Sequence, residues 1–334
     1  MTGKFTRYAA EATVFVAGLC LLFVLITGEP GALGDSVQTR LSGSLARLIS
    51  VTMLVGIAGI FLLERFLPAR PEQRGLTPPV AIDMAYMFLL FPATAGAILF
   101  VLSPLRSALD SNFSWLVLDS TRDWPILLQA SLGFIFSDFV SWLNHVLKHK
   151  VPFLWRFHII HHSQTRLNMF TPDRMHPIET FFDRLVNVLP LYFIFPNFTA
   201  EADKVLLFIL FFSWYTKLQH SNVRLNMGPL RYLLVTPQSH RIHHSTEPRH
   251  FNSNYGNIFC WDRLVGFQCS DDTTYPTTGI NDLRFPQPKR WAISDLCSNL
   301  LGQLAYPFDR DAVRKASEGS PHDTIAAAPG GPAS

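Results

Sequence analysis

Four long apolar segments lie in the first 144 residues and limit what this chain can fold into. They are residues 9–27, 48–63, 82–103 and 124–144. An α-helix needs about 20 apolar residues to cross roughly 30 Å of hydrocarbon, and a segment in hydrocarbon must satisfy its own backbone hydrogen bonds. Each segment is long enough, or nearly so, for one crossing. The sequence therefore predicts an all-α, multi-spanning membrane protein.

The amino-acid composition agrees with a membrane location and excludes other classes. Hydrophobic residues make up 48% of the 334 residues and charged residues 16%, against roughly a quarter charged in an average soluble domain. The four cysteines show no C-x-x-C spacing, so neither a disulfide framework nor a thiolate zinc site is expected. The net charge is +3 and no basic stripe is interleaved with aromatics, which argues against a nucleic-acid partner.

Lysine and arginine in the loops predict the orientation in the membrane. Basic residues are denser in residues 1–8, 64–81 and 145–156 than in the loops on the other side, so these segments are expected to be cytoplasmic. No small-residue cleavage site follows the first apolar segment, which is therefore expected to be an anchor and not a signal peptide. The Ala- and Pro-rich tail favours a bacterial inner membrane.

A further apolar region has two arms, residues 181–198 and 205–218. Each arm is short for a full crossing, so the region is expected either to dip into the bilayer or to form two tight spans. In both cases the chain leaves and returns on the same side. From residue 309 onward the chain is rich in Ala, Gly, Pro and Ser and is expected to be disordered.

Ten of the twelve histidines fall between residues 145 and 244, and eight of these form three clusters with helical spacing. The clusters are His145 and His149; His158, His161 and His162; and His240, His243 and His244. Spacings of three and four residues place the members of a cluster on one helical face. Pro152 and Pro237 precede the two triplets, where proline suits a first helical turn, and Thr236 is a candidate N-cap.

Eight imidazoles are too many for one metal ion but suit two ions with four or five nitrogen ligands each. His220 and His176 are candidate ninth and tenth ligands, whereas His250 and His322 are expected to be ordinary surface or core residues. Imidazole suits iron, zinc, copper and nickel. No acidic residue lies inside the three clusters, and hydrolytic zinc pairs usually include carboxylates, so the pattern favours a pair of irons that handles O2.

The histidine motifs resemble those of the fatty acid hydroxylase superfamily, which includes the sterol desaturases. The three boxes are HVLKH (145–149), HIIHH (158–162) and HRIHH (240–244). Similar surrounding segments are DFVSWLNH, RMHPIE, QHSN and NSNYGNIFCWDRLVGF. The resemblance covers about residues 80–270. It implies a catalytic domain with a cytoplasmic helical cap at 81–270. Outside it, the apolar segments predict membrane helices at 1–80, and we expect an extension of the cap at 271–308 and a disordered tail at 309–334.

The resemblance also implies an activity. Members bind two irons and use O2 with two external electrons to hydroxylate a C–H bond of a membrane lipid or isoprenoid, such as an acyl chain, sterol, ether lipid, amino lipid or carotenoid. Desaturation at the same site is the first alternative. A zinc-dependent hydrolase and a metal sensor or transporter are the others, although transporter sites tend to lie at the bilayer midplane.

A metal-dependent oxygenase also needs an electron donor and residues that orient the metal ligands. No cytochrome b5-like segment is fused to the chain, so a separate electron donor is expected: a ferredoxin, a cytochrome b5-like protein, another reductase-coupled carrier or a pterin. Ligand histidines usually donate their second N–H to an outer partner. Asp138, two turns before His145 on one helix, is expected to orient a ligand histidine; Glu179 and Asp262 are further candidates, and Asn254 to Gly256 are expected to shape a turn.

Overall fold

The computed structural model describes residues 43–309, apart from residues 74, 197–205, 226, 270, 272–273 and 283. The expected first span (9–27), the link between the two arms of the second apolar region, and the tail after residue 309 lie outside this part of the chain.

Within the described residues the fold is helical and contains no β-strand, only three isolated β-bridges. The helices are α3 (Gly43–Phe66), α4 (Pro78–Ala85), α5 (Phe91–Asn112), α6 (Ile126–Lys150), α7 (Pro152–His162), α8 (Pro177–Ile194), α10 (Leu206–His220), α11 (Pro237–His243), α12 (Trp261–Val265) and α13 (Ile293–Ala305). The prediction of an all-α fold is confirmed for these residues.

Among the described residues, two helical stretches are long and apolar enough to cross a membrane. One is Pro78–Asn112, in which a π-helical turn, Tyr86–Leu90, joins α4 to α5; the other is α6. They contain two of the four predicted spans, and the predicted span at 48–63 lies within α3. Large apolar side chains on both stretches are exposed, among them Phe100 and Leu127, as expected for a surface that faces lipid.

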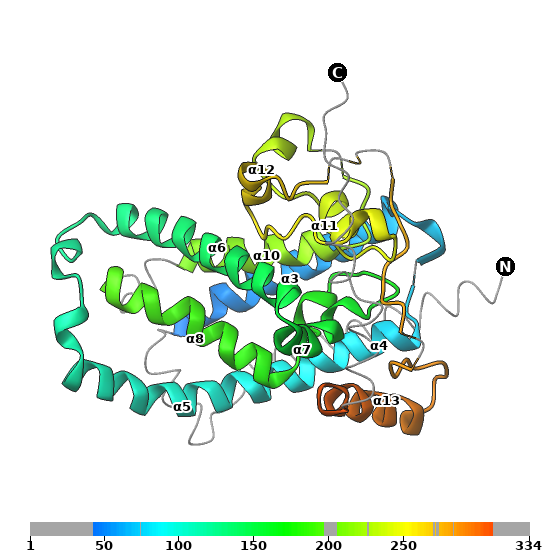
Figure 1. Cartoon of the computed structure of the whole chain (residues 1–334), viewed down its shortest axis with the longest axis horizontal. Coiled ribbons are helices and arrows are strands. Elements are labelled where there is room, and N and C mark those ends of the chain that lie inside the picture. The colour runs from blue at the N-terminus through cyan, green and yellow to red at the C-terminus, as the bar shows by residue number, and fades with distance from the viewer. Residues whose placement is uncertain are drawn as a thin grey trace.

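The arms of the second apolar region form α8 and α10, which have 18 and 15 residues. At 1.5 Å per residue these helices are about 27 Å and 22 Å long, shorter than the roughly 30 Å of a hydrocarbon core. Helix α8 packs against both α5 and α6, and α10 packs against α3 and α11 (Figure 1).

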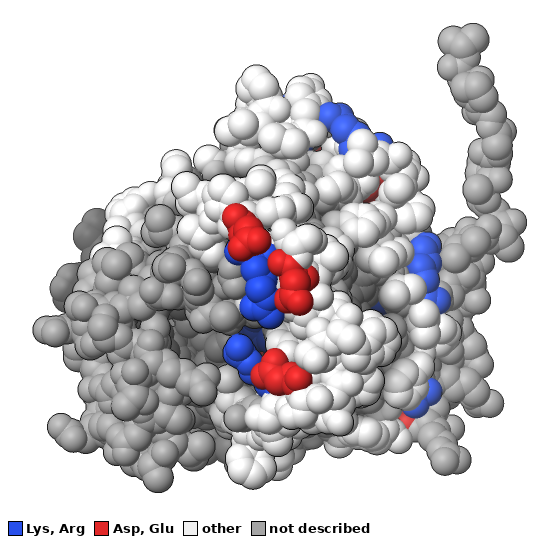
Figure 2. Space-filling model, turned by 90° about the vertical axis from the view of Figure 1, so that its left-hand side faces the viewer, with Lys and Arg blue, Asp and Glu red and all other residues white. Residues whose placement is uncertain are grey.

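The connection between α5 and α6 forms one end of the molecule (Figure 1), and several acidic and basic side chains lie close together on the face that Figure 2 shows. Ion pairs in this part of the chain join Arg106 to Asp110 and Arg122 to Asp119. Trp115 and Trp124 are exposed beside them, and tryptophan is enriched where a membrane meets water. Because α6 begins at this end, its last turn, which carries His145 and His149, lies at the other.

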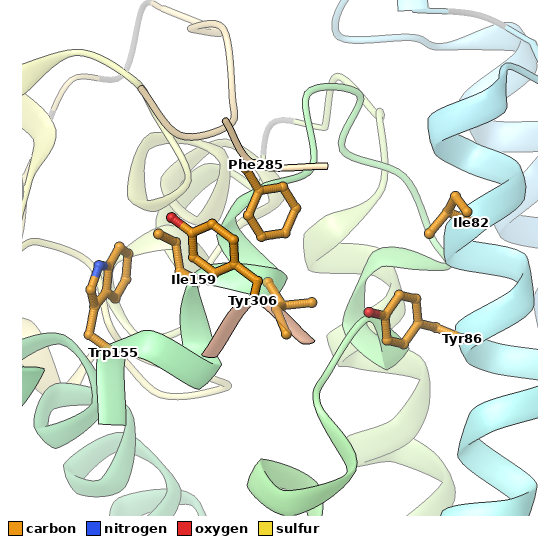
Figure 3. Close-up of a cluster of buried hydrophobic side chains, with 7 residues drawn as sticks. Ile82, Tyr86, Trp155, Ile159, Phe285 and Tyr306 are labelled. Atoms are coloured by element: carbon orange, nitrogen blue, oxygen red, sulfur yellow. The ribbon is translucent and has the colours of Figure 1, made fainter. Parts of the chain in front are cut away.

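A buried hydrophobic cluster joins α4, α7 and the C-terminal segment (Figure 3). Its members are Ile82 from α4, Tyr86 from the π-helical turn that follows α4, Trp155, Ile159 and Ile160 from α7, and Phe285 and Tyr306. Leucines of α13 pack against it. The cluster fixes α7, the helix of the second histidine box, and its member Trp155 packs against the rings of His149 and His162.

Candidate metal centre

Nine buried histidines lie together in two adjacent groups. The first group is His145, His149, His158, His162 and His243, and the second group is His161, His220, His240 and His244. Within each group, one potential ligand atom from every histidine lies within 4.8 Å of the others. The groups touch, because the rings of His162 and His244 stack with centroids 4.3 Å apart.

Each triplet of histidines is divided between the two groups. From α7, the pair His158 and His162, four residues apart, enters the first group, and His161 enters the second. Helix α11 and its C-cap residue His244 do the reverse: the pair His240 and His244 belongs to the second group, and His243 to the first. The repeated motif therefore links the two groups through both helices, and neither triplet forms a site of its own.

Local structure fixes the two short histidine-bearing helices, α7 and α11. Pro152 and Pro237 occupy the first turns of α7 and α11, where the missing N–H of proline costs nothing. Helix α11 begins with a capping box, in which the Thr236 side chain accepts from the Ser239 N–H and the Ser239 hydroxyl accepts from the Thr236 N–H. The N-cap predicted at Thr236 is confirmed.

Backbone carbonyls hold several imidazoles in one orientation. The Nδ1–H of His145 donates to the Tyr255 carbonyl at 2.7 Å, that of His243 to the Ser253 carbonyl at 2.8 Å, and that of His220 to the Thr216 carbonyl at 2.8 Å. An imidazole that donates through Nδ1 presents the lone pair of Nε2 when neutral. These three histidines therefore direct Nε2 lone pairs into the groups.

The ring nitrogens inside the groups suit metal ions. The Nε2 atoms of His243 and His145 lie 3.0 Å apart, and those of His240 and His220 lie 2.8 Å apart. Such separations suit neighbouring ligands at metal–nitrogen distances of roughly 2.0–2.1 Å. Among the described residues, the buried Nε2 atoms of His149, His158 and His162 have no hydrogen-bond partner. Buried polar atoms without partners are costly, and a metal ion in the first group, to which all three belong, would satisfy them.

The environment keeps the imidazoles neutral. Burial, and next the charges of neighbouring histidines, lower the pKa of His161, His240 and His244 well below the usual 6.5. Burial lowers the pKa of His243 to about 4. Neutral imidazole is the form that binds a metal, so these positions are ready for ligation at neutral pH.

Glu179 is the carboxylate that supports the first group. Its Oε1 accepts from the His158 Nδ1–H at 2.6 Å and pairs with the Lys148 ammonium at 2.8 Å. Lys148 also pairs with Asp183 at 2.6 Å. Glu179 thus has the kind of contact that was predicted for it, and Lys148, inside the HVLKH box, is a supporting residue that the sequence reading missed.

Asp138 contacts no histidine in the structure, so the orienting role predicted for it is wrong. Its carboxylate accepts from the backbone N–H groups of Ile258 and Phe259 and from the Trp261 indole. The reason is geometric: this position of α6 faces a segment that returns from far along the sequence. Asp138 therefore anchors the segment whose earlier residues, Ser253 and Tyr255, hold His243 and His145.

The structure has a turn at residues 251–252 and a bend at residues 257–258, on either side of Asn254 to Gly256, for which the sequence predicted a turn. Asn252 and Asn254 have φ values of 60° and 57°, a conformation that asparagine tolerates better than most residues. The Asn254 amide bonds to the Ser239 carbonyl and to the backbone of Cys269. Asp262 accepts from Gly256 N–H and from the Trp142 indole, so it supports this part of the chain and not a histidine.

The structure does not bring His176 into either group. Its Nδ1 accepts from the Ile178 N–H as the N-cap of α8, and its Nε2–H donates to the Leu304 carbonyl at 3.2 Å. Both ring nitrogens are therefore occupied by structural hydrogen bonds. His250 also lies outside the groups, is buried, and bonds to the Ser245 hydroxyl; His322 lies outside the described residues.

The fold and the site define a helical protein with membrane-type helices and a buried, histidine-only pair of candidate metal sites. Residues 130–267 match the family model for fatty acid hydroxylase. These residues therefore contain a fatty acid hydroxylase domain, and the resemblance that the histidine boxes indicated is confirmed.

Two kinds of characterised relatives are similar to this chain. Ornithine lipid hydroxylase OlsE of Rhizobium tropici is 28% identical over 295 residues, covering 83% of this chain and 80% of that protein. Alkylglycerol monooxygenase of Xenopus tropicalis is 32% identical over 136 residues, 40% of this chain and 29% of that protein. The human alkylglycerol monooxygenase is 30% identical over 46% of this chain and 32% of its own length. No solved structure shows significant similarity.

Proposed function

We propose that this protein is a membrane-bound, O2-dependent di-iron enzyme that hydroxylates a C–H bond of a membrane lipid. The observation that carries the proposal is the composition of the two histidine groups: five and four buried imidazoles, with no carboxylate within either group. Nitrogen-rich sites suit iron, whereas hydrolytic zinc pairs usually include carboxylates. The similarity to lipid hydroxylases and monooxygenases supports the same reaction class.

The protein's own residues would bind and orient the metals. The first group would hold one iron and the second group the other, with His162 and His244 in contact between them. Two bound irons would supply the capacity to activate O2 with two external electrons for insertion of one oxygen atom into a C–H bond. The carbonyls of Tyr255, Ser253 and Thr216 keep three of the ligands in the required tautomer.

A polar lipid with an amino-acid headgroup is the substrate class to test first. The ornithine lipid hydroxylase aligns with four fifths of both chains, while the alkylglycerol monooxygenases align over about a third of their own length. Ether lipids are the second class. Electrons would come from a separate protein or pterin donor, and the basic loops beside the spans favour a cytoplasmic site.

The test is accurate-mass lipid profiling of cells grown under 18O2 with no gene, the intact gene, or the His243→Ala variant. His250→Gln is the matched control, because this histidine is buried but belongs to neither group. A lipid that gains one labelled oxygen only with the intact gene and the control variant supports the proposal.

Two other outcomes would redirect the assignment. Loss of two hydrogens without label would make the enzyme a desaturase. Absence of any oxidised lipid from cells whose protein holds two metals and has a redox partner would favour the hydrolase or sensor alternatives.

A further inference from the structure

Helix α13 presents an exposed apolar face that the proposed chemistry does not use. Ile293 is 81% exposed and Leu301 is 65% exposed, and Cys297 between them is exposed as well. These positions are four residues apart, so they follow one another along one side of the helix. An apolar stripe of this kind on the surface usually marks an interaction site.

The adjoining side of α13 is firmly packed, so the helix is a fixed part of the molecule. Leu296, Leu300 and Leu304 pack against the core cluster of α4 and α7. At the start of the helix, the Asp295 carboxylate accepts from the backbone N–H groups of Lys289 and Arg290. The exposed stripe is therefore displayed in one orientation.

Polar residues flank the stripe on one side. Ser294 and Ser298 are exposed and lie on the side of Leu301 that is turned away from the packed leucines, as the helical angle of 100° per residue requires. Going around the helix axis, the packed leucines come first, the exposed apolar stripe next and the two serines last. This order is typical of a helix that lies in a membrane surface with one edge in lipid and the other in water.

The surroundings of α13 point to the same partner. Helix α13 packs on α4, which begins the candidate span Pro78–Asn112. Trp291 is 59% exposed just before the helix, and tryptophan favours the boundary between lipid and water. Lys289 and Arg290 are exposed beside it, where they can meet anionic headgroups.

We propose that α13 lies in the headgroup region of an anionic phospholipid bilayer, with Ile293, Cys297 and Leu301 turned toward the acyl chains. The proposal rests on the membrane location in the proposed function and is independent of the chemistry at the histidines. It has a structural consequence, because α13 contacts α7 through the core cluster and the N-terminus of α8 through the His176 to Leu304 hydrogen bond. The bilayer surface would thereby set the height of the histidine groups above the membrane.

The test is spin labelling of full-length protein in nanodiscs, starting from a variant with all four cysteines replaced by serine. Single cysteines are placed at 293, 297 and 301 on the stripe and at 294 and 298 on the serine side. Leu99→Cys, on an exposed position of the candidate span, is the control for membrane insertion itself. Collision of each label with O2, which concentrates in lipid, and with a water-soluble nickel chelate reports its depth.

The proposal predicts lipid-type collision at 293, 297 and 301 and water-type collision at 294 and 298. Replacing Lys289 and Arg290 by glutamate should reduce the depth of the stripe labels in discs with anionic lipid and leave it unchanged in zwitterionic discs. Water-type collision at all five positions, with a lipid-type label at 99, would overturn the proposal.

Two further outcomes are distinguishable from that one. If the stripe labels collide with neither reagent and show dipolar coupling between two chains, the stripe is covered by a second copy of this protein and not by the bilayer. A water-type label at position 99 would contradict the membrane location in the proposed function and would remove the basis of the proposal for α13.

Discussion

Glu179 connects the first histidine group to a buried lysine, and its contacts predict how metal binding depends on it. Glu179→Ala would leave the His158 Nδ1–H without its acceptor and Lys148 with Asp183 alone. Loss of such an outer partner typically lowers metal affinity about 10–100-fold. We expect a loss of this size in chelator competition, and a smaller one for Glu179→Gln.

A surface carboxylate provides the control for this experiment. Glu247 pairs with Arg249 at an exposed position away from the histidines, so Glu247→Gln should leave metal affinity unchanged. Wild-type affinity in Glu179→Ala would contradict the role assigned to this glutamate.

Gly256 is a position where the backbone beside the site leaves no room for a side chain. A Cβ added there would lie 2.6 Å from the Phe259 carbonyl oxygen and 2.7 Å from a methyl of Val235. Overpacking of this kind costs about 1–3 kcal/mol and would shift the Tyr255 carbonyl that holds His145. Gly256→Ala should therefore lower both the unfolding midpoint and the metal content.

Gly59 offers the matched control for Gly256, since a Cβ at this helical position meets nothing within 4 Å. Gly59→Ala should keep the metal and leave the unfolding midpoint equal or higher, because alanine is the better helix former. If the two variants have the same unfolding midpoint and the same metal content, the lack of space around Gly256 affects neither stability nor metal binding.

Two residues show what sequence spacing can and cannot predict. The position of Asp138 two turns before His145 correctly places both on α6, but its hydrogen-bond partners come from residues 258–261, a pairing that only the folded chain defines. His176 lies near the histidine boxes in sequence, yet it begins α8 and bonds to Leu304. Local periodicity gave no information about either contact.

Helix α11 depends on its cap, because its seven residues are far fewer than an isolated helix needs for stability. Thr236→Ala removes the side chain that accepts from the Ser239 N–H and should cost about 1 kcal/mol. Denaturant unfolding in detergent measures this loss, and Thr236→Ser should restore most of it. Unfolding curves of the alanine and serine variants that coincide would argue against the cap.

The histidines on α7 and α11 predict how the metal-free protein responds to pH. Their pKa values in the folded state lie below the usual 6.5, and that of His243 is lowered to about 4. Below pH 6.5 the unfolded chain takes up protons that the folded chain does not, so the free energy of unfolding falls as the pH falls. Above pH 6.5 these imidazoles are neutral in both the folded and the unfolded state, so the free energy of unfolding depends less on pH.

Unfolding of the metal-free protein at pH 7.5, 6.5, 5.5 and 5.0 measures this dependence. Replacing His240 and His244 by glutamine should reduce the slope, because two of the groups are removed. A stability that stays constant or rises from pH 7.5 to pH 5.0 would contradict neutral burial of these imidazoles.

At the scale of helices, the i, i+3, i+4 spacing correctly predicted the helical faces of α7 and α11 and the meeting of the three boxes. It could not predict that each triplet divides between two groups. That division depends on how α7 and α11 approach each other, with His162 stacked on His244. Such an approach is set by packing between segments about eighty residues apart and leaves no periodic signal.

At the scale of the whole molecule, apolar segment lengths predicted the helical class and two helices that can span a membrane. They did not predict the exposed stripe of α13, because its apolar residues alternate with packed leucines and serines over only 13 residues. The stripe can be recognised only in the structure, where the packing of Leu296, Leu300 and Leu304 shows which side of α13 remains uncovered.

If the two histidine groups hold two irons, the iron content of the purified protein should show it. The metal content per chain of protein from iron-replete cells is compared with that of His162→Ala from the first group and His161→Ala from the second. We expect two irons per wild-type chain and a loss of iron in both variants, with His250→Gln unchanged. One metal per chain, zinc in place of iron, or full iron content in either alanine variant would contradict the di-iron proposal.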